Sequence, residues 1–238
     1  MIETVWLNNP PVNAVNRDII DTLWTAFEIL GDDVHAVVLR GRGERAFSAG
    51  ADITGFVGGS SDDGRPAGIQ PVADLIEAAP VPVIAAIHGY CLGGGLEIAL
   101  ACDYRIATRD AQLGFPEVNL GLLPGGGGTQ RAPRLISPGR AAWLIMSGER
   151  IDAETALDWG LVEFVVDDLD AGIEEHLGHL DRQSPHAIRQ IKSLLRDTRD
   201  RRDDEREVEA FAACLNSEDG QEGVAAFLEK RKANWTGR

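Results

Sequence analysis

Two glutamates lie in otherwise apolar sequence. Glu97 lies one turn into Leu96–Ala101, and Glu117 follows twenty residues later within Leu113–Val118. A carboxylate in such surroundings must be paired, protonated or used in chemistry, because burying it as an unpaired charge is costly. Two of them suit acid–base catalysis near neutral pH. Their spacing leaves a structural role equally open, in which backbone N–H groups or Arg131 bind the carboxylates.

A glycine run, Gly93-Gly94-Gly95, comes just before Glu97. It joins an expected buried strand, 83–87, to an expected helix, 96–102. Glycines at such a junction let a ligand approach the backbone, and the N–H groups at the start of a helix are free to bind an anion. The phosphate-binding patterns G-K-[ST] and G-x-G-x-x-G are absent from this block. A simple packing turn explains the glycines equally well.

Cys91 offers a different chemistry. The segment Gly89–Gly93 fits a nucleophile elbow with cysteine in place of serine, as in a thiol-dependent hydrolase. Such an enzyme needs an acid and a downstream histidine, for which His176, His179 and His186 are available. They lie in polar helical sequence with no turn to orient them, so we favour a buried, inert cysteine.

Composition narrows the function classes. The 238 residues allow one full-sized domain with a small addition, and 44% hydrophobic with 26% charged residues is ordinary globular usage. The net charge of −15 argues against a nucleic-acid binder. Three cysteines without C-x-x-C spacing indicate free thiols in a reducing compartment, and no histidine falls in a metal-ligand pattern. We therefore expect a cytoplasmic protein with no metal site.

Neither a leader peptide nor a membrane span is expected. The N-terminus carries an early acid, Glu3, and no basic region. Residues 83–102 contain one formal charge and are long enough to span a bilayer. The glycine run interrupts this stretch and Pro80 and Pro82 precede it, so a strand, a turn and a helix explain it better.

The periodicity predicts alternating strands and helices, hence an α/β fold. Before residue 183 we expect an α/β core made of strands at 2–7, 36–39, 83–87, 104–107 and up to Val166, and helices after Asn16, at 96–102 and from Asp152 to Trp159. Segment 55–71 is rich in Gly, Ser and Asp and predicts a loop. Ser184-Pro185 opens a helical region, 184–238, with further helices near 205–214 and 218–232.

Five segments, occurring in the family's order, make the chain resemble the enoyl-CoA hydratase/isomerase (crotonase) family over essentially its whole length. They lie within Asn9–Ala14, Phe47–Ile53, Gly89–Glu97, Phe115–Arg131 and Phe227–Trp235. The resemblance implies a crotonase-like spiral of ββα units over 1–183 and a C-terminal helical trimerisation region over 184–238. Each motif is weak singly, but their order is specific.

The resemblance also implies an active site for CoA thioesters. It places the two oxyanion-hole N–H donors at Ala51 and Gly94, and the acid–base pair of hydratases at Glu97 and Glu117. The positions expected to bind substrate are Ala49, Asp52, Ile53, Gly125, Phe227 and Lys230. Thr54 stands where relatives often have lysine, which removes one expected phosphate contact and makes the basic tail around Lys230 a candidate for the CoA phosphates.

These residues predict a lyase that adds water across the double bond of a 2-enoyl-CoA thioester, as in the β-oxidation of fatty acids. The thioester oxygen would gain charge in the oxyanion hole while Glu97 takes a proton from water and Glu117 gives one to Cα. No cofactor is expected beyond the coenzyme A of the substrate, and the family resemblance implies a homotrimer or a dimer of trimers. An enoyl-CoA isomerase, an acyl-CoA hydrolase, a Cys91-dependent hydrolase and a non-catalytic acyl-CoA binder remain alternatives.

Overall fold

The computed structural model describes residues 1–31, 33–52, 68–197, 211, 213–214 and 216–238, except for the side chain of Phe227. Ile53, Thr54 and most of the predicted loop 55–71 lie outside this part of the chain. The described residues form two compact units, one of Met1–Ala79 with Val83–Ile173 and one of Pro80–Pro82 with Glu174–Arg238. The sequence predicts that the C-terminal helical region starts at residue 184, whereas the second unit includes the chain from Glu174 onward.

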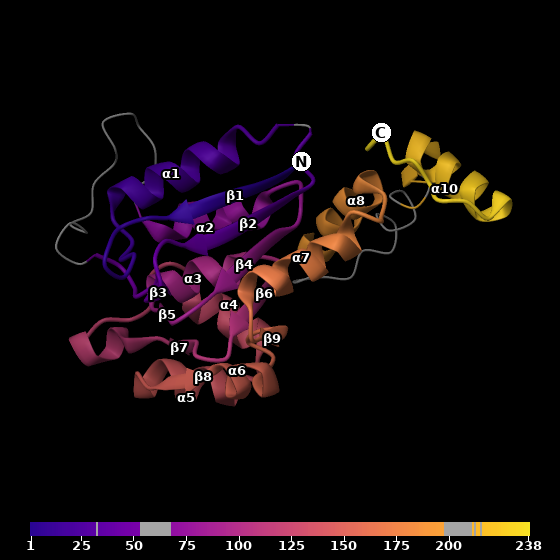
Figure 1. The fold of residues 1–238 in the computed structure, drawn as a ribbon. Coiled ribbons are helices and arrows are strands. Elements are labelled where there is room, and N and C mark those ends of the chain that lie inside the picture. Colours follow the sequence, from indigo (N-terminus) through magenta and orange to yellow (C-terminus); the bar gives the residue numbers. More distant parts are fainter. Residues whose placement is uncertain (32, 53–67, 198–210, 212, 215) are drawn as a thin grey trace. The chain divides into compact units, whose positions relative to one another are not determined.

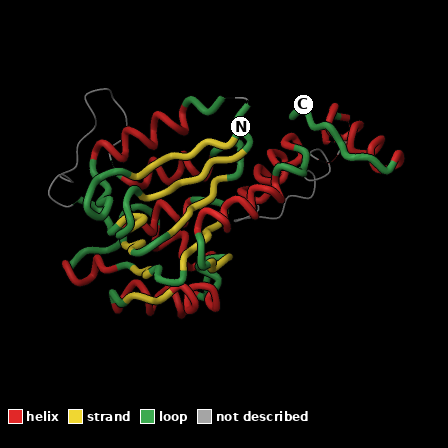
Figure 2. The backbone as a smooth tube through the Cα atoms, viewed as in Figure 1, coloured by secondary structure: helices red, strands yellow, loops and turns green. Residues whose placement is uncertain are grey.

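Two sheets form the first unit (Figure 1). The larger is parallel throughout, and its strands lie in the order β1 (Ile2–Leu7), β2 (Ala36–Gly41), β4 (Val83–Ile87), β6 (Tyr104–Thr108) and β9 (Phe164–Val166). The smaller contains β3 (Ala46–Ser48), β5 (Tyr90–Leu92), β7 (Gln112–Gly114) and the antiparallel β8 (Arg150–Asp152). The strands of the larger sheet run side by side in Figure 2.

A repeated unit builds these sheets, in which a strand of the larger sheet is followed by a strand of the smaller sheet and a helix. The successive repeats are β2-β3-α2 (Ile69–Ala78), β4-β5-α3 (Gly94–Ala101) and β6-β7-η1, a 3₁₀ helix over Pro116–Leu120. The predicted ββα spiral is confirmed. The central strand of the larger sheet, β4, is buried at every position, which explains why it appears in the sequence as one continuous apolar run.

Local sequence signals explain where several elements begin and end. α1 (Arg17–Glu28) starts after Asn16, whose side chain accepts a hydrogen bond from the Ile19 N–H at 3.0 Å. α6 (Ala153–Trp159) is capped by Asp152 and ends at Gly160, whose φ of 82° is left-handed. These boundaries were predicted from the cap residues.

Several predicted boundaries were wrong, including the end of the helix predicted over 218–232, which ends at Glu229, and the starts of α2 and α3. α2 begins at Ile69, so Ile69–Pro71, which were predicted as loop, are helical, and Gly68 before them has a φ of 104°. α3 begins at Gly94 and not at Leu96. Glycine disfavours helix in isolation, but every residue of α3 is buried, and tertiary packing outweighs the propensity.

The sequence did not reveal the short strands β3, β5, β7 and β8, each of three residues, because hydrophobic periodicity needs a longer segment. The helices α4 (Gly128–Leu135) and α5 (Pro138–Ser147) were also missed. Two of these missed elements matter for the site: β5 leads into α3, and α4 follows the glycines beside Glu97.

Helices dominate the second unit. α7 (Leu169–Leu180) crosses into it, and α8 (Pro185–Asp197) and α10 (Glu218–Glu229) follow. Buried Asp219 accepts hydrogen bonds from Ser184 Oγ at 2.8 Å and from the Thr236 N–H at 2.6 Å, which ties the end of the chain to the start of α8. The predicted helix near 205–214 lies largely outside the described residues. None of the helices in the described parts of the chain is long and apolar enough to cross a membrane.

Candidate active site

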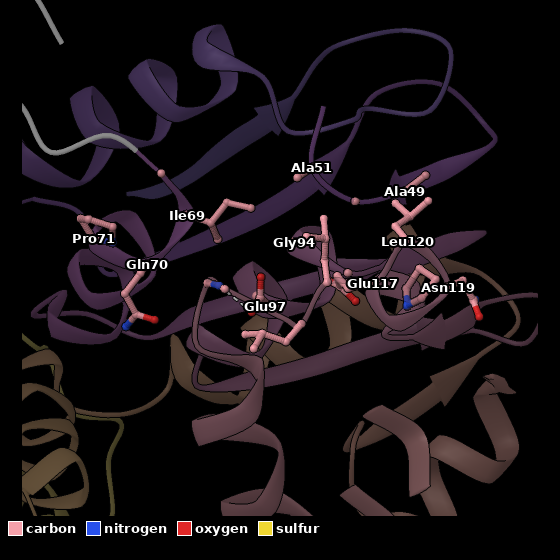
Figure 3. Close-up of a pocket in the computed structure, with 18 residues that line it drawn as sticks. Ala49, Ala51, Ile69, Gln70, Pro71, Gly94, Glu97, Glu117, Asn119 and Leu120 are labelled. Atoms are coloured by element: carbon pink, nitrogen blue, oxygen red, sulfur yellow. Dashed lines mark hydrogen bonds between the residues drawn. The ribbon is translucent and has the colours of Figure 1, made fainter. Parts of the chain in front are cut away.

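A cavity of about 790 Å³ in the first unit brings six predicted site residues together. Its walls include Ala49, Ala51, Gly94, Glu97, Glu117 and Gly125 (Figure 3). Asp52 is not among the residues that line it. Ile53 and the side chain of Phe227 lie outside the described part of the chain, and Lys230 belongs to the second unit.

Glu97 is held in place by the loop opposite it. Its side chain projects from α3 and is 2% exposed, and its Oε1 accepts hydrogen bonds from the N–H groups of Gly126 at 2.7 Å and Gly128 at 2.8 Å. Burial raises the pKa of Glu97, while these two bonds and the charge of Arg131 oppose the rise. The carboxylate is thus both oriented and kept closer to its ionised form than burial alone would allow.

The loop after Pro124 lies very close to this carboxylate. A Cβ on Gly126 would come within 2.5 Å of Glu97 Oε2, and one on Gly128 within 3.1 Å of Oε1. Glycine at these positions lets two backbone amides approach one carboxylate without displacing its side chain or the ring of Phe115. The contacts foreseen for a structural role of Glu97 are therefore present, and they also orient it toward the cavity.

Glu117 occupies a different environment. It lies on η1, and its Oε2 is buried with no hydrogen-bond partner among the described residues. Burial, joined by the negative charge of Glu97 and opposed by a bond from its own backbone N–H, raises the pKa of Glu117 to about 7. A Cβ on Gly93 would lie 2.7 Å from Glu117 Oε1, and the φ of 49° at Gly93 also favours glycine there. Glu117 can therefore carry a proton near neutral pH.

Two backbone N–H groups lie at the same cavity. Gly94 is the first residue of α3, so its N–H has no acceptor within the helix. A Cβ on Gly94 would lie 3.4 Å from the Ala51 nitrogen, which shows how closely the two segments approach. Ala51 is fixed by pairing with Val15, through Val15 N–H to Gly50 O and Asp52 N–H to Val15 O, and neither bond uses its own N–H. In Figure 3 both residues lie above the two glutamates.

Sequence reasoning missed part of the wall. Gly68 and the first turn of α2, Ile69–Pro71, line the cavity, as do Leu120 at the end of η1 and Leu122 and Leu123 after it. The sequence carried a signal for these leucines, because they form a short apolar stretch outside every predicted helix and strand. The three leucines are 56% to 68% exposed, so they form an apolar rim.

Cys91 does not have the features of a nucleophile. It lies within β5, is fully buried, and is not among the residues that line the cavity. Burial raises its pKa well above the ordinary value, which disfavours the reactive thiolate. In a nucleophile elbow the residue is exposed on a turn.

Within the described residues, no group of three or more His, Cys, Asp or Glu side chains is arranged to hold a metal ion. The absence of a metal or a separate cofactor remains a prediction.

Comparison with known proteins agrees with this geometry. The family model described as enoyl-CoA hydratase/isomerase matches residues 1–238. The chain belongs to the enoyl-CoA hydratase/isomerase family. It is 39% identical to a protein named crotonyl-CoA hydratase from Syntrophomonas wolfei, over 98% of this chain and 94% of that protein. It is also 39% identical to the short-chain-enoyl-CoA hydratase of Clostridium acetobutylicum, over 97% and 92% of the two chains.

Solved structures share the fold. The structure of DspI from Pseudomonas aeruginosa matches with a TM-score of 0.90 at 41% identity, over 98% of this chain and 93% of that one. An enoyl-CoA hydratase from Bacillus anthracis matches with a TM-score of 0.91 at 35% identity, over 100% and 96%. The family resemblance and the crotonase-like fold inferred from the five motifs are confirmed.

Proposed function

We propose that the chain is an enoyl-CoA hydratase that converts a 2-enoyl-CoA thioester to the 3-hydroxyacyl-CoA. One observation carries the proposal: two carboxylates with different environments face one cavity, beside the backbone N–H groups of Ala51 and Gly94. A cavity with only the N–H donors would polarise a thioester without supplying the acid and base that hydration needs.

The roles of the glutamates follow from their environments. Glu97 receives two N–H donors and the field of Arg131, all of which favour its carboxylate form. Glu117 Oε2 has no hydrogen-bond partner among the described residues, and its pKa of about 7 leaves a substantial fraction protonated at neutral pH. Glu97 is therefore the general base and Glu117 the general acid.

In the reaction, Glu97 takes one proton from a water molecule while the water oxygen bonds to Cβ of the enoyl group. The π electrons of the double bond move toward the thioester carbonyl, whose oxygen is stabilised by the N–H groups of Ala51 and Gly94. In other enzymes the loss of one such donor costs about 3–4 kcal/mol of transition-state stabilisation. Glu117 then gives its proton to Cα, and exchange with solvent restores both glutamates.

The relatives' names suggest the substrate length. Two of them are named for crotonyl-CoA and short-chain enoyl-CoA hydration, and a third, carnitinyl-CoA dehydratase from Salmonella typhi, is 35% identical over 98% of this chain. The proposed substrate is accordingly a short 2-enoyl-CoA. Assembly as a homotrimer or a dimer of trimers, a cytoplasmic location and the absence of a separate cofactor belong to the same proposal, supported by the family membership and the free cysteines.

The test is to mix the protein with crotonyl-CoA and follow the absorbance of the enoyl thioester. Hydration predicts that the absorbance falls while no free CoA thiol appears. Release of thiol would indicate an acyl-CoA hydrolase, and turnover of 3-enoyl-CoA alone would indicate an isomerase. Saturable binding with no change in absorbance would indicate a non-catalytic binder.

A Cys91→Ser variant separates the remaining alternative. Because the Cys91 thiol is buried away from the cavity, we expect this variant to keep wild-type hydration. Loss of all turnover in a folded Cys91→Ser protein would instead support the thiol-dependent hydrolase.

A further inference from the structure

Arg131 is a buried cation next to the cavity. It lies on α4, is 4% exposed, and is not among the residues of the cavity wall. Its Nη2 donates to Asp74 Oδ1 at 2.7 Å and to Glu77 Oε2 at 2.9 Å, both on α2. Asp74 also accepts from Gln70 Nε2 at 2.8 Å, and Gln70 is part of the wall. The two acids satisfy a charge that would otherwise be costly to bury.

The guanidinium reaches Glu97 through a single residue. Arg131 Nη1 donates to the carbonyl oxygen of Gly126 at 3.2 Å, and the N–H of the same Gly126 donates to Glu97 Oε1 at 2.7 Å. The neighbouring Gly127 has a φ of 103°, and a Cβ there would lie 2.0 Å from Arg131 Nη1. Glycine at this position is therefore needed for the guanidinium to reach Gly126 at all.

The charges around Glu97 make Arg131 distinctive. The titratable and charged groups on the elements packed against α3, and on η1, are Asp74 and Glu77 of α2, Arg131 and Arg134 of α4, Tyr90 and Cys91 of β5, Tyr104 and Arg105 of β6, and Glu117 of η1. Arg105 donates hydrogen bonds to the carbonyl oxygens of Ala99 and Cys102, near the C-terminal end of α3, and forms an ion pair with Glu163. Arg131 is the cation whose charge opposes the raised pKa of Glu97.

We propose that Arg131 is a positioning residue for the general base: clamped by Asp74 and Glu77, it fixes Gly126 and thereby the orientation and charge of Glu97. The identity of the reaction rests on the proposed function, whereas the coupling between Arg131 and Glu97 does not. Removing Arg131 frees the Gly126 loop and removes a nearby positive charge. Removing the charge of Glu77 leaves Arg131 in place, held by Asp74, with its positive charge less compensated.

Opposite shifts are expected from these two changes. In Arg131→Gln, the acidic limb of the kcat/KM profile with crotonyl-CoA moves to higher pH by about half a unit or more, since a lost cation disfavours the carboxylate. A displaced base also lowers kcat by about 10- to 100-fold, with a smaller change in KM. Arg131→Lys keeps the charge and gives a smaller shift. In Glu77→Gln, the limb moves to lower pH.

The matched control is Arg140→Gln, because Arg140 makes an exposed ion pair with Asp158 on α5 and α6. This variant leaves the pH profile unchanged. The titration of Glu97 is also read without turnover, from the carboxyl ¹³C signal of glutamate-labelled protein, assigned by its loss in Glu97→Gln.

Opposite displacements of the Glu97 titration in Arg131→Gln and Glu77→Gln support the proposal. Titrations equal to wild type in folded variants overturn it. If Arg131→Gln fails to fold, Glu77→Gln decides by the same criterion. A wild type that hydrates no enoyl-CoA refutes the proposed function alone, since the ¹³C titration still reports whether Arg131 acts on Glu97.

Discussion

Glu117 provides a test in which activity and stability change in opposite directions. Its carboxyl group is half-buried, one oxygen has no hydrogen-bond partner in the described structure, and its pKa is raised from 4.5 to about 7. Glu117→Gln keeps the shape of the side chain but removes its titration. We expect kcat to fall by at least about 100-fold while acyl-CoA binding is retained, as for a general acid.

The stability effect has a definite sign. Between about pH 4.5 and 7 the unfolded chain has lost the proton that the folded chain keeps, so the stability of the wild type falls as pH rises through this window. A shift of about 2.5 pKa units corresponds to about 3.4 kcal/mol, at 1.36 kcal/mol per unit. Because Glu117 faces an open cavity and is only half-buried, solvent screening reduces this to about 1–2 kcal/mol.

The neutral glutamine avoids this loss. The melting temperatures of wild type and variant at pH 5 and pH 8.5 measure this loss of stability. Comparing the difference between the two proteins at one pH with that at the other removes any constant effect of the substitution. At 2–4 °C per kcal/mol for a chain of this size, the variant should gain about 2–8 °C over wild type at pH 8.5 relative to pH 5. Glu97→Gln is a matched comparison, since it also removes a carboxylate but leaves two N–H donors facing an amide.

A difference in melting temperature that is the same at both pH values would refute the reasoning, and so would a variant that loses stability at pH 8.5 relative to pH 5. Either result would mean that Glu117 ionises in the folded protein at least as easily as in the unfolded chain. The assignment of Glu117 as the group protonated at neutral pH would then fail with it.

Three further changes test the site and the tail. Glu97→Gln should lower kcat for crotonyl-CoA by at least about 100-fold while acyl-CoA still binds, and near-wild-type turnover would remove Glu97 from the mechanism. Gly126→Ala places a Cβ within 2.5 Å of Glu97 Oε2 and should lower kcat by about tenfold or more with little change in KM, measured by steady-state kinetics. Lys230→Glu should weaken CoA binding in a salt-dependent way and affect a pantetheine thioester less, as calorimetry at two salt concentrations can measure; equal effects on both ligands would leave Lys230 without a role in binding phosphate.

Much of the framework could be predicted from short-range signals. The Asn16 and Asp152 caps located two helices, and continuous apolar runs located the buried strands of the larger sheet. Each of these features is stabilised by contacts within a few residues or by burial of a whole segment, so its pattern is visible in the sequence. The three-residue strands of the smaller sheet have no such pattern, because their pairing partners are distant in the chain.

The sequence by itself determined which residues could do chemistry at this site. Two acids in apolar segments were enough to name Glu97 and Glu117 as candidates, and the family resemblance added Gly94 from the glycine run before them. Only the tertiary structure decided that they share one cavity and that their carboxylates differ. Glu97 is bound by amides of Gly126 and Gly128, which lie 29 and 31 residues away, whereas Glu117 has an oxygen with no such partner in the part of the chain that the structure describes. The pKa of a carboxyl group depends on the dielectric and charges within a few ångströms, and residues distant in sequence supply both.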